Sequence, residues 1–82
     1  MKDRKITEGS IWRHYKGQSY KIICVGYNAN SIEKPIDSDK LVVYESLYED
    51  VEYGNYAKWV RCKKDFLSKV NGNKYRFIKM QN

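Results

Sequence analysis

Cysteine, histidine and proline are scarce in this chain of 82 residues, which has two cysteines, one histidine and one proline. Cys24 and Cys62 are too few for a disulfide framework or a four-cysteine zinc site. A single histidine, His14, excludes a multi-histidine metal site within one copy of the chain. We therefore expect no metal ion and no cofactor. Because Cys24 lies in an apolar run, we interpret it as a thiol of the hydrophobic core.

Long hydrophobic runs are also absent. The longest aliphatic runs cover residues 22–25 and 41–43, whereas a membrane-spanning helix needs about 18 or more apolar residues. Residues 1–10 show no apolar signal region, which a secreted protein would need. We therefore expect a cytoplasmic protein that has reduced thiols and no membrane partner.

The short length favours one domain with little internal space. A chain of this size buries only about 60–65% of its unfolded surface, so most of its large side chains are needed for one modest core. The glycine-rich phosphate loop and the Gly-x-Ser-x-Gly elbow are both absent from the sequence, and nucleotide hydrolases and serine hydrolases use these motifs. We predict a protein that is not an enzyme, with a frayed N-terminal segment, 1–8, and a single small β domain, 9–82.

Basic residues are in excess, with 16 Lys and Arg against 10 Asp and Glu, which gives a formal net charge of +6. Six basic and two acidic residues lie in 1–27 (+4), two basic and seven acidic in 28–57 (−5), and eight basic and one acidic in 58–82 (+7). If the two ends of the chain pair in space, they form one positive surface, with an acidic edge elsewhere.

Aromatic and β-branched residues alternate with polar residues in several short segments, which is typical of strands. We predict strands over the segments 10–15, 20–27, 41–47, 56–62 and 75–80. The first segment is expected to form a hairpin with the second, and the third segment with the fourth. The expected fold is mainly β: a small antiparallel SH3-like barrel, or a strongly bent sheet, of about five strands with one short helix near residues 63–70.

That helix is predicted because Phe66, Leu67 and Val70 follow helical spacing. Residues 71–73 should end it, with Gly72 in the left-handed cap. Residues 28–40 make the longest connection, and long connections in small domains are often functional. The role of this loop stays open.

Basic residues are interleaved with aromatic ones in three blocks, residues 12–16, 58–64 and 74–77. Arginine offers a bidentate fork to phosphate, and an aromatic ring can stack on a base. Any basic sheet shows similar alternation, so this signal has low specificity. We interpret Trp12 and Trp59 as core residues and not as platforms for a base.

The run 9–17, followed by Tyr20, closely resembles the opening block of the domain of unknown function 1653 family. The runs 41–48 and 59–67 resemble its second and third blocks, and 75–77 resembles its closing block. The resemblance implies a compact, mostly β protein of bacteria and their phages without an established enzymatic activity. The longer loop 28–40, and Cys62 in place of the usual proline, depart from the family pattern.

The polar residues within these blocks are the candidate ligand-binding residues, together with one basic residue of the last block: His14, Lys16, Tyr44, Tyr48, Arg61 and Arg76. Our leading hypothesis is a non-enzymatic binding module for a phosphate-bearing ligand. This ligand could be RNA, single-stranded DNA or a nucleotide, including a signalling nucleotide that a phage protein sequesters. Arg61, Lys16 and Arg76 would hold phosphate, while His14 and Tyr48 would contact a base or sugar.

Two alternatives stay open. The first is a protein-interaction module, or a phage inhibitor of a host protein, that acts through the acidic and tyrosine-rich edge 45–56. The second is a hydrolase or nuclease that uses His14, although Arg13 and Lys16 should favour the neutral form of this imidazole. The sequence does not fix the oligomeric state and leaves a homodimer open.

Overall fold

The computed structural model describes residues 4–29 and 39–80. The elements follow one another along the chain as β1 (Ile11–His14), β2 (Ser19–Gly26), β3 (Leu41–Ser46), β4 (Glu49–Asp50), β5 (Gly54–Asn55), β6 (Lys58–Cys62), α1 (Lys63–Phe66), β7 (Lys69–Asn71), β8 (Lys74–Tyr75) and β9 (Phe77–Lys79). The expectation of a mainly β fold with one short helix is confirmed.

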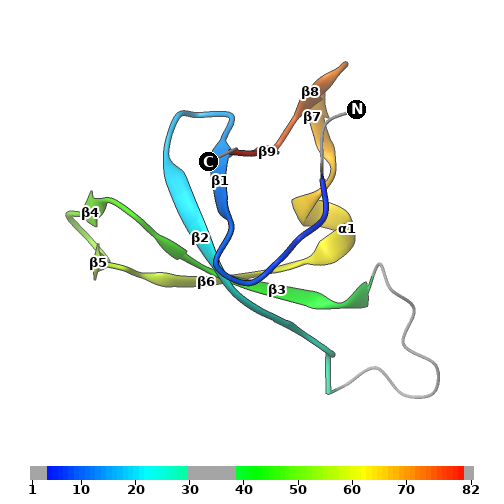
Figure 1. The fold of residues 1–82 in the computed structure, drawn as a ribbon. Coiled ribbons are helices and arrows are strands. Elements are labelled where there is room, and N and C mark those ends of the chain that lie inside the picture. Colours follow the sequence, from blue (N-terminus) through cyan, green and yellow to red (C-terminus); the bar gives the residue numbers. More distant parts are fainter. Residues whose placement is uncertain (1–3, 30–38, 81–82) are drawn as a thin grey trace.

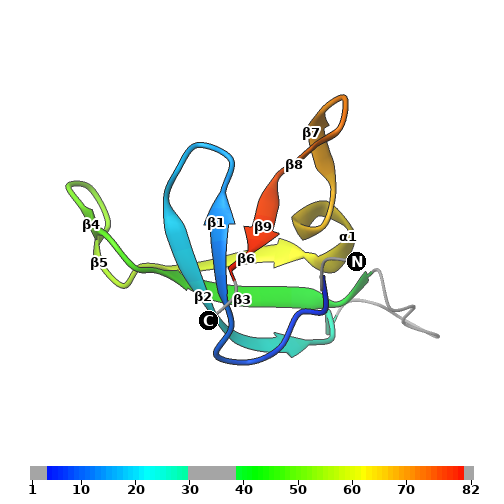
Figure 2. The same cartoon turned by 45° about the horizontal axis from the view of Figure 1, so that its top comes forward.

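Five of the strands form one antiparallel sheet in the order β6-β3-β2-β1-β9. Its two edge strands do not pair with each other, so the sheet is curved but open (Figure 1). Of the two forms expected, the bent sheet is therefore the one observed, and the closed barrel is not. Two small ladders extend from the sheet: β4 pairs with β5, and β7 pairs with β8. Figure 2 shows them projecting from different ends of the molecule.

The core lies on the inner face of the curved sheet and is largely aromatic. Its buried hydrophobic side chains are Trp12, Ile22, Val42, Tyr44, Phe66 and Phe77. The rings of Phe66 and Phe77 stack with their centroids 4.1 Å apart, and Trp12 meets Phe66 edge-on at 5.2 Å. Trp59 is partly buried and packs against this cluster. The interpretation of both tryptophans as core residues agrees with these positions.

Cys24 is exposed, so its interpretation as a core thiol is wrong. The cause is an irregularity in β2, where Ile22 pairs with Tyr44 but Cys24 pairs with the next residue of β3, Val43. The extra residue between them is a bulge, which shifts the alternation of side chains by one position. Ile22 therefore points into the core, and Cys24 faces solvent.

The predicted helix 63–70 is only one turn long, because α1 covers Lys63–Phe66. The chain then enters the β7–β8 hairpin, where Gly72 has a φ of +60°. Gly72 is left-handed as predicted, but it serves a hairpin turn and not a helix cap. The predicted strand 75–80 is divided between β8 and β9, which belong to different sheets.

The N-terminal segment is held against the sheet from Arg4 onward. The Arg4 guanidinium donates hydrogen bonds to the carbonyls of Phe77 and Leu67, and Ile6 packs against the core. Arg4 and Ile6, which belong to the segment 1–8 that we expected to be frayed, therefore contact the domain, while residues 1–3 lie outside the described part. Most of the long loop, 30–38, also lies outside it. No helix among the described residues has the length and apolar character needed to cross a membrane.

Candidate functional site

Several of the predicted site residues meet around the ring of Phe77, which lies on β9 at the edge of the core. Its centroid is 4.9 Å from the ring of His14 and 5.5 Å from that of Tyr44. The guanidinium carbon of Arg61 lies 5.9 Å from the same centroid. Strands β1, β3, β6 and β9 therefore bring together residues that are far apart in the sequence.

Tyr20, which the sequence analysis did not select as a site residue, joins the predicted residues at this place. Its ring meets those of Tyr44 and Tyr48 edge-on, at 5.2 Å and 5.7 Å. The hydroxyl oxygens of Tyr20 and Tyr48 are 3.0 Å apart and share a hydrogen bond. Burial, and then this hydrogen bond with Tyr48, raise the pKa of Tyr20 well above its usual range. Tyr20 is therefore a neutral hydroxyl at physiological pH.

Arg61 is held by two groups at once. Its Nε donates to the hydroxyl of Tyr44 at 3.3 Å, and its Nη1 donates to Oδ2 of Asp65 at 2.5 Å. Burial acts to lower the pKa of Arg61, but its hydrogen bonds with Tyr44 and Asp65 outweigh that and raise it. Tyr44 itself is only 4% exposed, so it positions Arg61 and offers little surface to a ligand.

Arg76 approaches the same carboxylate from the other side. Its Nη2 is 3.8 Å from Oδ1 of Asp65, and its Nε donates to the hydroxyl of Ser68 at 3.3 Å. Two arginines from separate segments therefore converge on one aspartate. The sequence analysis missed Asp65 and Ser68. The four-residue spacing of Arg61 and Asp65 was the available signal, but their meeting depends on how β6 turns into α1.

His14 lies beside these arginines. Its Nδ1 accepts a hydrogen bond from the backbone N–H of Lys16 at 3.2 Å. Partial burial, and then the positive charges of Arg61, Arg76 and Lys16, lower the pKa of His14. The expected neutral imidazole agrees with this direction, and Lys16 was correctly taken as one of its causes, whereas Arg13, the other expected cause, is not among them. The two arginines, which come from distant parts of the chain, could not be recognised from local sequence.

A hollow of about 410 Å³ opens next to His14, between the β1–β2 turn and strands β8 and β9. It is lined by Arg13, His14, Tyr15, Gly17, Lys74, Tyr75, Ile78 and Met80. The ring of Tyr15 is 37% exposed. The ammonium nitrogens of Lys16 and Lys74 each lie 5.8 Å from the Tyr15 centroid. The hollow thus combines positive charge with accessible aromatic surface.

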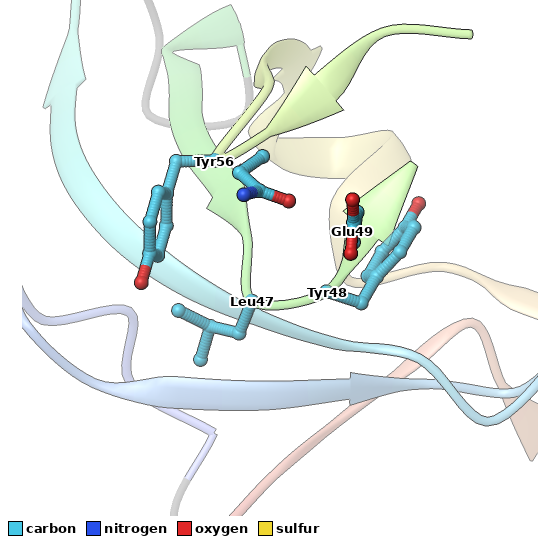
Figure 3. A pocket seen from close by; sticks show the side chains of 5 residues that line it. Leu47, Tyr48, Glu49 and Tyr56 are labelled. Carbon is cyan, nitrogen blue, oxygen red and sulfur yellow. The ribbon is translucent and has the colours of Figure 1, made fainter. Parts of the chain in front are cut away.

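A second, smaller hollow lies where the β4–β5 ladder leaves the sheet, and Figure 3 shows the side chains around it. Its volume is about 150 Å³, and its lining residues are Leu47, Tyr48, Glu49, Asn55 and Tyr56. Large apolar side chains are exposed along the same ladder, with Val51 at 106%, Tyr53 at 60% and Tyr56 at 59%. We call residues 47–56 the arm.

The described residues contain no group of three or more His, Cys, Asp or Glu side chains placed to hold a metal ion. Of the six candidate residues, the structure places His14, Tyr44, Arg61 and Arg76 around Phe77 and Asp65. Tyr48 is connected to them through Tyr20. Lys16 lies in the turn beside His14.

Comparison with known proteins identifies one family. The model of a family described as a protein of unknown function (DUF1653) matches residues 10–79, which is most of the chain. The chain therefore belongs to this family, as the sequence resemblance indicated. No curated protein and no solved structure matches it significantly.

Proposed function

We propose that this member of the DUF1653 family is a non-enzymatic binding module for a phosphate-bearing ligand, that is, RNA, single-stranded DNA or a nucleotide. The observation that carries the proposal is the convergence of Arg61 and Arg76 beside the partly exposed rings of His14 and Tyr20. The proposed setting is the cytoplasm.

Positive charge is the first argument for this ligand class. The positive charges of Arg61, Arg76 and Lys16 all lower the pKa of His14, as nearby cations do. Asp65 is the carboxylate that the structure pairs with both arginines, so one negative charge faces two positive ones. Arginine forms short, charge-assisted and often bidentate hydrogen bonds with phosphate oxygens. An anionic group is therefore the expected ligand of this basic cluster.

Shape is the second argument. The hollow beside His14 offers the exposed ring of Tyr15 and the partly buried ring of Tyr75. A base stacked on an aromatic ring gains about 1–3 kcal/mol. In the proposed arrangement, Arg61, Arg76 and Lys16 hold phosphate, while His14, as a neutral imidazole, and Tyr48 contact sugar or base. Tyr44 keeps Arg61 in place.

The direct test is binding of adenosine 5′-monophosphate and of a short single-stranded RNA to the Arg61→Ala variant, measured by isothermal titration calorimetry. We expect Arg61→Ala to lose about tenfold or more in affinity, because charge-assisted hydrogen bonds contribute about 1.5–3 kcal/mol. Lys21→Ala is the matched control, since Lys21 is an exposed cation that follows Tyr20 in β2 and points to the opposite face. It should bind like the unaltered protein. Equal binding by Arg61→Ala, or no binding of either probe, would contradict the proposal.

A protein partner at the arm is the second candidate function. It is favoured by the exposure of Val51, Tyr53 and Tyr56, because exposed aromatic and apolar side chains of this kind are enriched at interfaces. Sequence positions 45–56 carry four acidic residues and no basic one, so the fitting partner is a basic protein surface.

A further inference from the structure

Asp65 occupies the position between the two arginines that the proposed phosphate needs. Arg61 donates to its Oδ2, and the Nη2 of Arg76 lies 3.8 Å from its Oδ1. The side chain of Asp65 is 42% exposed, so an incoming anion can reach it from solvent. The carboxylate therefore either fixes the arginines in place or holds a position that a ligand anion takes over.

The two arginines have anchors that do not involve the carboxylate. Tyr44 is buried, and its hydroxyl accepts from Nε of Arg61. The hydroxyl of Ser68 accepts from Nε of Arg76. In both cases Nε is held and a terminal nitrogen faces Asp65. If the Asp65 side chain turned away, each guanidinium would keep its direction, and the terminal nitrogen that faces Asp65 would become available to a ligand.

The backbone of Asp65 is fixed independently of its side chain. Its carbonyl accepts hydrogen bonds from the Ser68 backbone N–H at 3.1 Å and from the Ser68 hydroxyl. A rotation of the side chain towards solvent therefore needs no movement of α1. Ion pairs of this exposure contribute only modestly to stability, because solvent competes for both partners. Displacing the carboxylate thus costs little.

We propose that Asp65 is an internal anion that competes with ligand phosphate for Arg61 and Arg76, so that any phosphate must displace it and binds more weakly than it would to the two arginines alone. This rests on the proposed function. A phosphodiester that replaces Asp65 exchanges one negative charge for another, whereas a phosphomonoester brings close to two charges and three acceptor oxygens. The cost of displacing Asp65 is the same for both ligands.

The test uses two ligands that share one base. Adenosine 5′-monophosphate and 3′,5′-cyclic adenosine monophosphate are titrated by calorimetry at about pH 7.5, where the monoester is mostly dianionic because its second pKa is near 6. The unaltered protein should bind the monoester more tightly than the cyclic diester. Asp65→Asn keeps the shape and removes the competing charge. It should bind both ligands about two- to fivefold more tightly, because neither then has to displace a charged competitor.

Two controls separate this effect from general ones. Glu8→Gln removes an exposed carboxylate of the N-terminal segment, with the same change in net charge, and should leave both affinities unchanged. Thermal unfolding of Asp65→Asn verifies that the variant folds, and Asp65→Ser is the second variant that removes the same charge. If neither Asp65 variant binds the two ligands more tightly than the unaltered protein does, the inference is overturned and Asp65 is a positioning residue.

Failure of the inference and failure of the proposed function give different results. If Arg61→Ala abolishes binding of the monoester while Asp65→Asn changes nothing, the phosphate site stands and the role of Asp65 is wrong. If Arg61→Ala binds like the unaltered protein, the phosphate site itself is wrong. If no variant binds either ligand, both proposals fall. Tighter binding of the diester by Asp65→Asn, together with loss of binding in Arg61→Ala, supports both.

Discussion

His14 shows how single side chains in this site acquire properties that their neighbours in sequence do not dictate. Partial burial and three nearby cations disfavour its charged form. A histidine whose folded pKa lies below its unfolded pKa binds fewer protons when folded. It therefore costs stability as pH falls through the window from 6.5, its ordinary pKa, down to the folded value. Above that window the cost is absent.

We predict that Arg61→Ala raises the pKa of His14, because it removes a repelling charge. The measurement is the titration of the His14 ring by NMR in the unaltered protein and in the variant. The unaltered protein should titrate below 6.5, and Arg61→Ala should titrate at higher pH. Lys58→Ala, which removes a cation paired with Glu45, should leave the titration unchanged. A His14 pKa unaffected by Arg61→Ala would show that the two residues are not electrostatically coupled.

Much of the candidate site could be predicted at the residue scale. The rest could not be predicted, and the reason is physical. His14 and Arg61 were recognisable because a polar residue inside a strand has few packing roles, and Arg76 was recognisable as a basic residue of the block 74–77. Tyr20 and Asp65 were missed. An aromatic residue in a strand is equally compatible with core and with site, and an aspartate beside lysines suggests only solubility. Their roles depend on which side chains meet across strands. The register of the strands and the curvature of the sheet determine those contacts.

At the scale of elements, the N-terminal segment connects the edge strand β9 to the end of α1. One terminal nitrogen of Arg4 donates to the carbonyl of Phe77 in β9 at 2.9 Å, and the other to that of Leu67, just after α1, at 3.2 Å. The same guanidinium lies 3.7 Å from the centroid of Tyr75. A single planar guanidinium thus joins two segments that belong to different elements.

We predict that Arg4→Ala lowers the free energy of unfolding by about 1–3 kcal/mol, because two carbonyls lose a charged donor and Tyr75 loses a stacked cation. Urea denaturation followed by tryptophan fluorescence measures this, since Trp12 lies 5.6 Å from the same guanidinium. Arg4→Lys is the matched variant. It keeps the charge but cannot reach both carbonyls, so it should recover only part of the loss. Full recovery by lysine would show that charge alone matters.

The elements were predictable where periodicity alone determines them. Strands β1, β3 and β6 lie within the segments that alternation indicated, and β2 is shifted from its segment by one residue. The other departures occur where one residue changes the pattern. The bulge between Ile22 and Cys24 reverses the face of the thiol, and Gly72 lies in the turn of the β7–β8 hairpin in place of ending a longer helix. Such events depend on pairing with a partner strand, which a single segment does not contain.

At the scale of the whole molecule, the uneven charge of the sequence becomes two separate surfaces. The basic cluster around Arg61 and Arg76 lies where β6, α1 and β9 meet, whereas the acidic arm projects from the far end of β3 and β6 (Figures 1 and 2). Tyr48 belongs to both, since it lines the hollow of the arm and shares a hydrogen bond with Tyr20. The two candidate functions therefore correspond to two surfaces that can be altered separately.

We predict that the basic surface carries the function, and native mass spectrometry of the protein isolated from bacterial cells can decide this. The two variants to compare are Arg61→Ala and the triple charge reversal Glu49→Lys, Asp50→Lys and Glu52→Lys. A phosphate-bearing molecule should be found bound to the unaltered protein and to the arm variant, but not to Arg61→Ala. If that molecule is a nucleic acid, its affinity should fall steeply as the salt concentration rises, because binding releases counterions from the nucleic acid. A protein partner retained by Arg61→Ala and lost from the arm variant would instead establish the arm as the functional surface, because only an interface at the acidic ladder responds in that way.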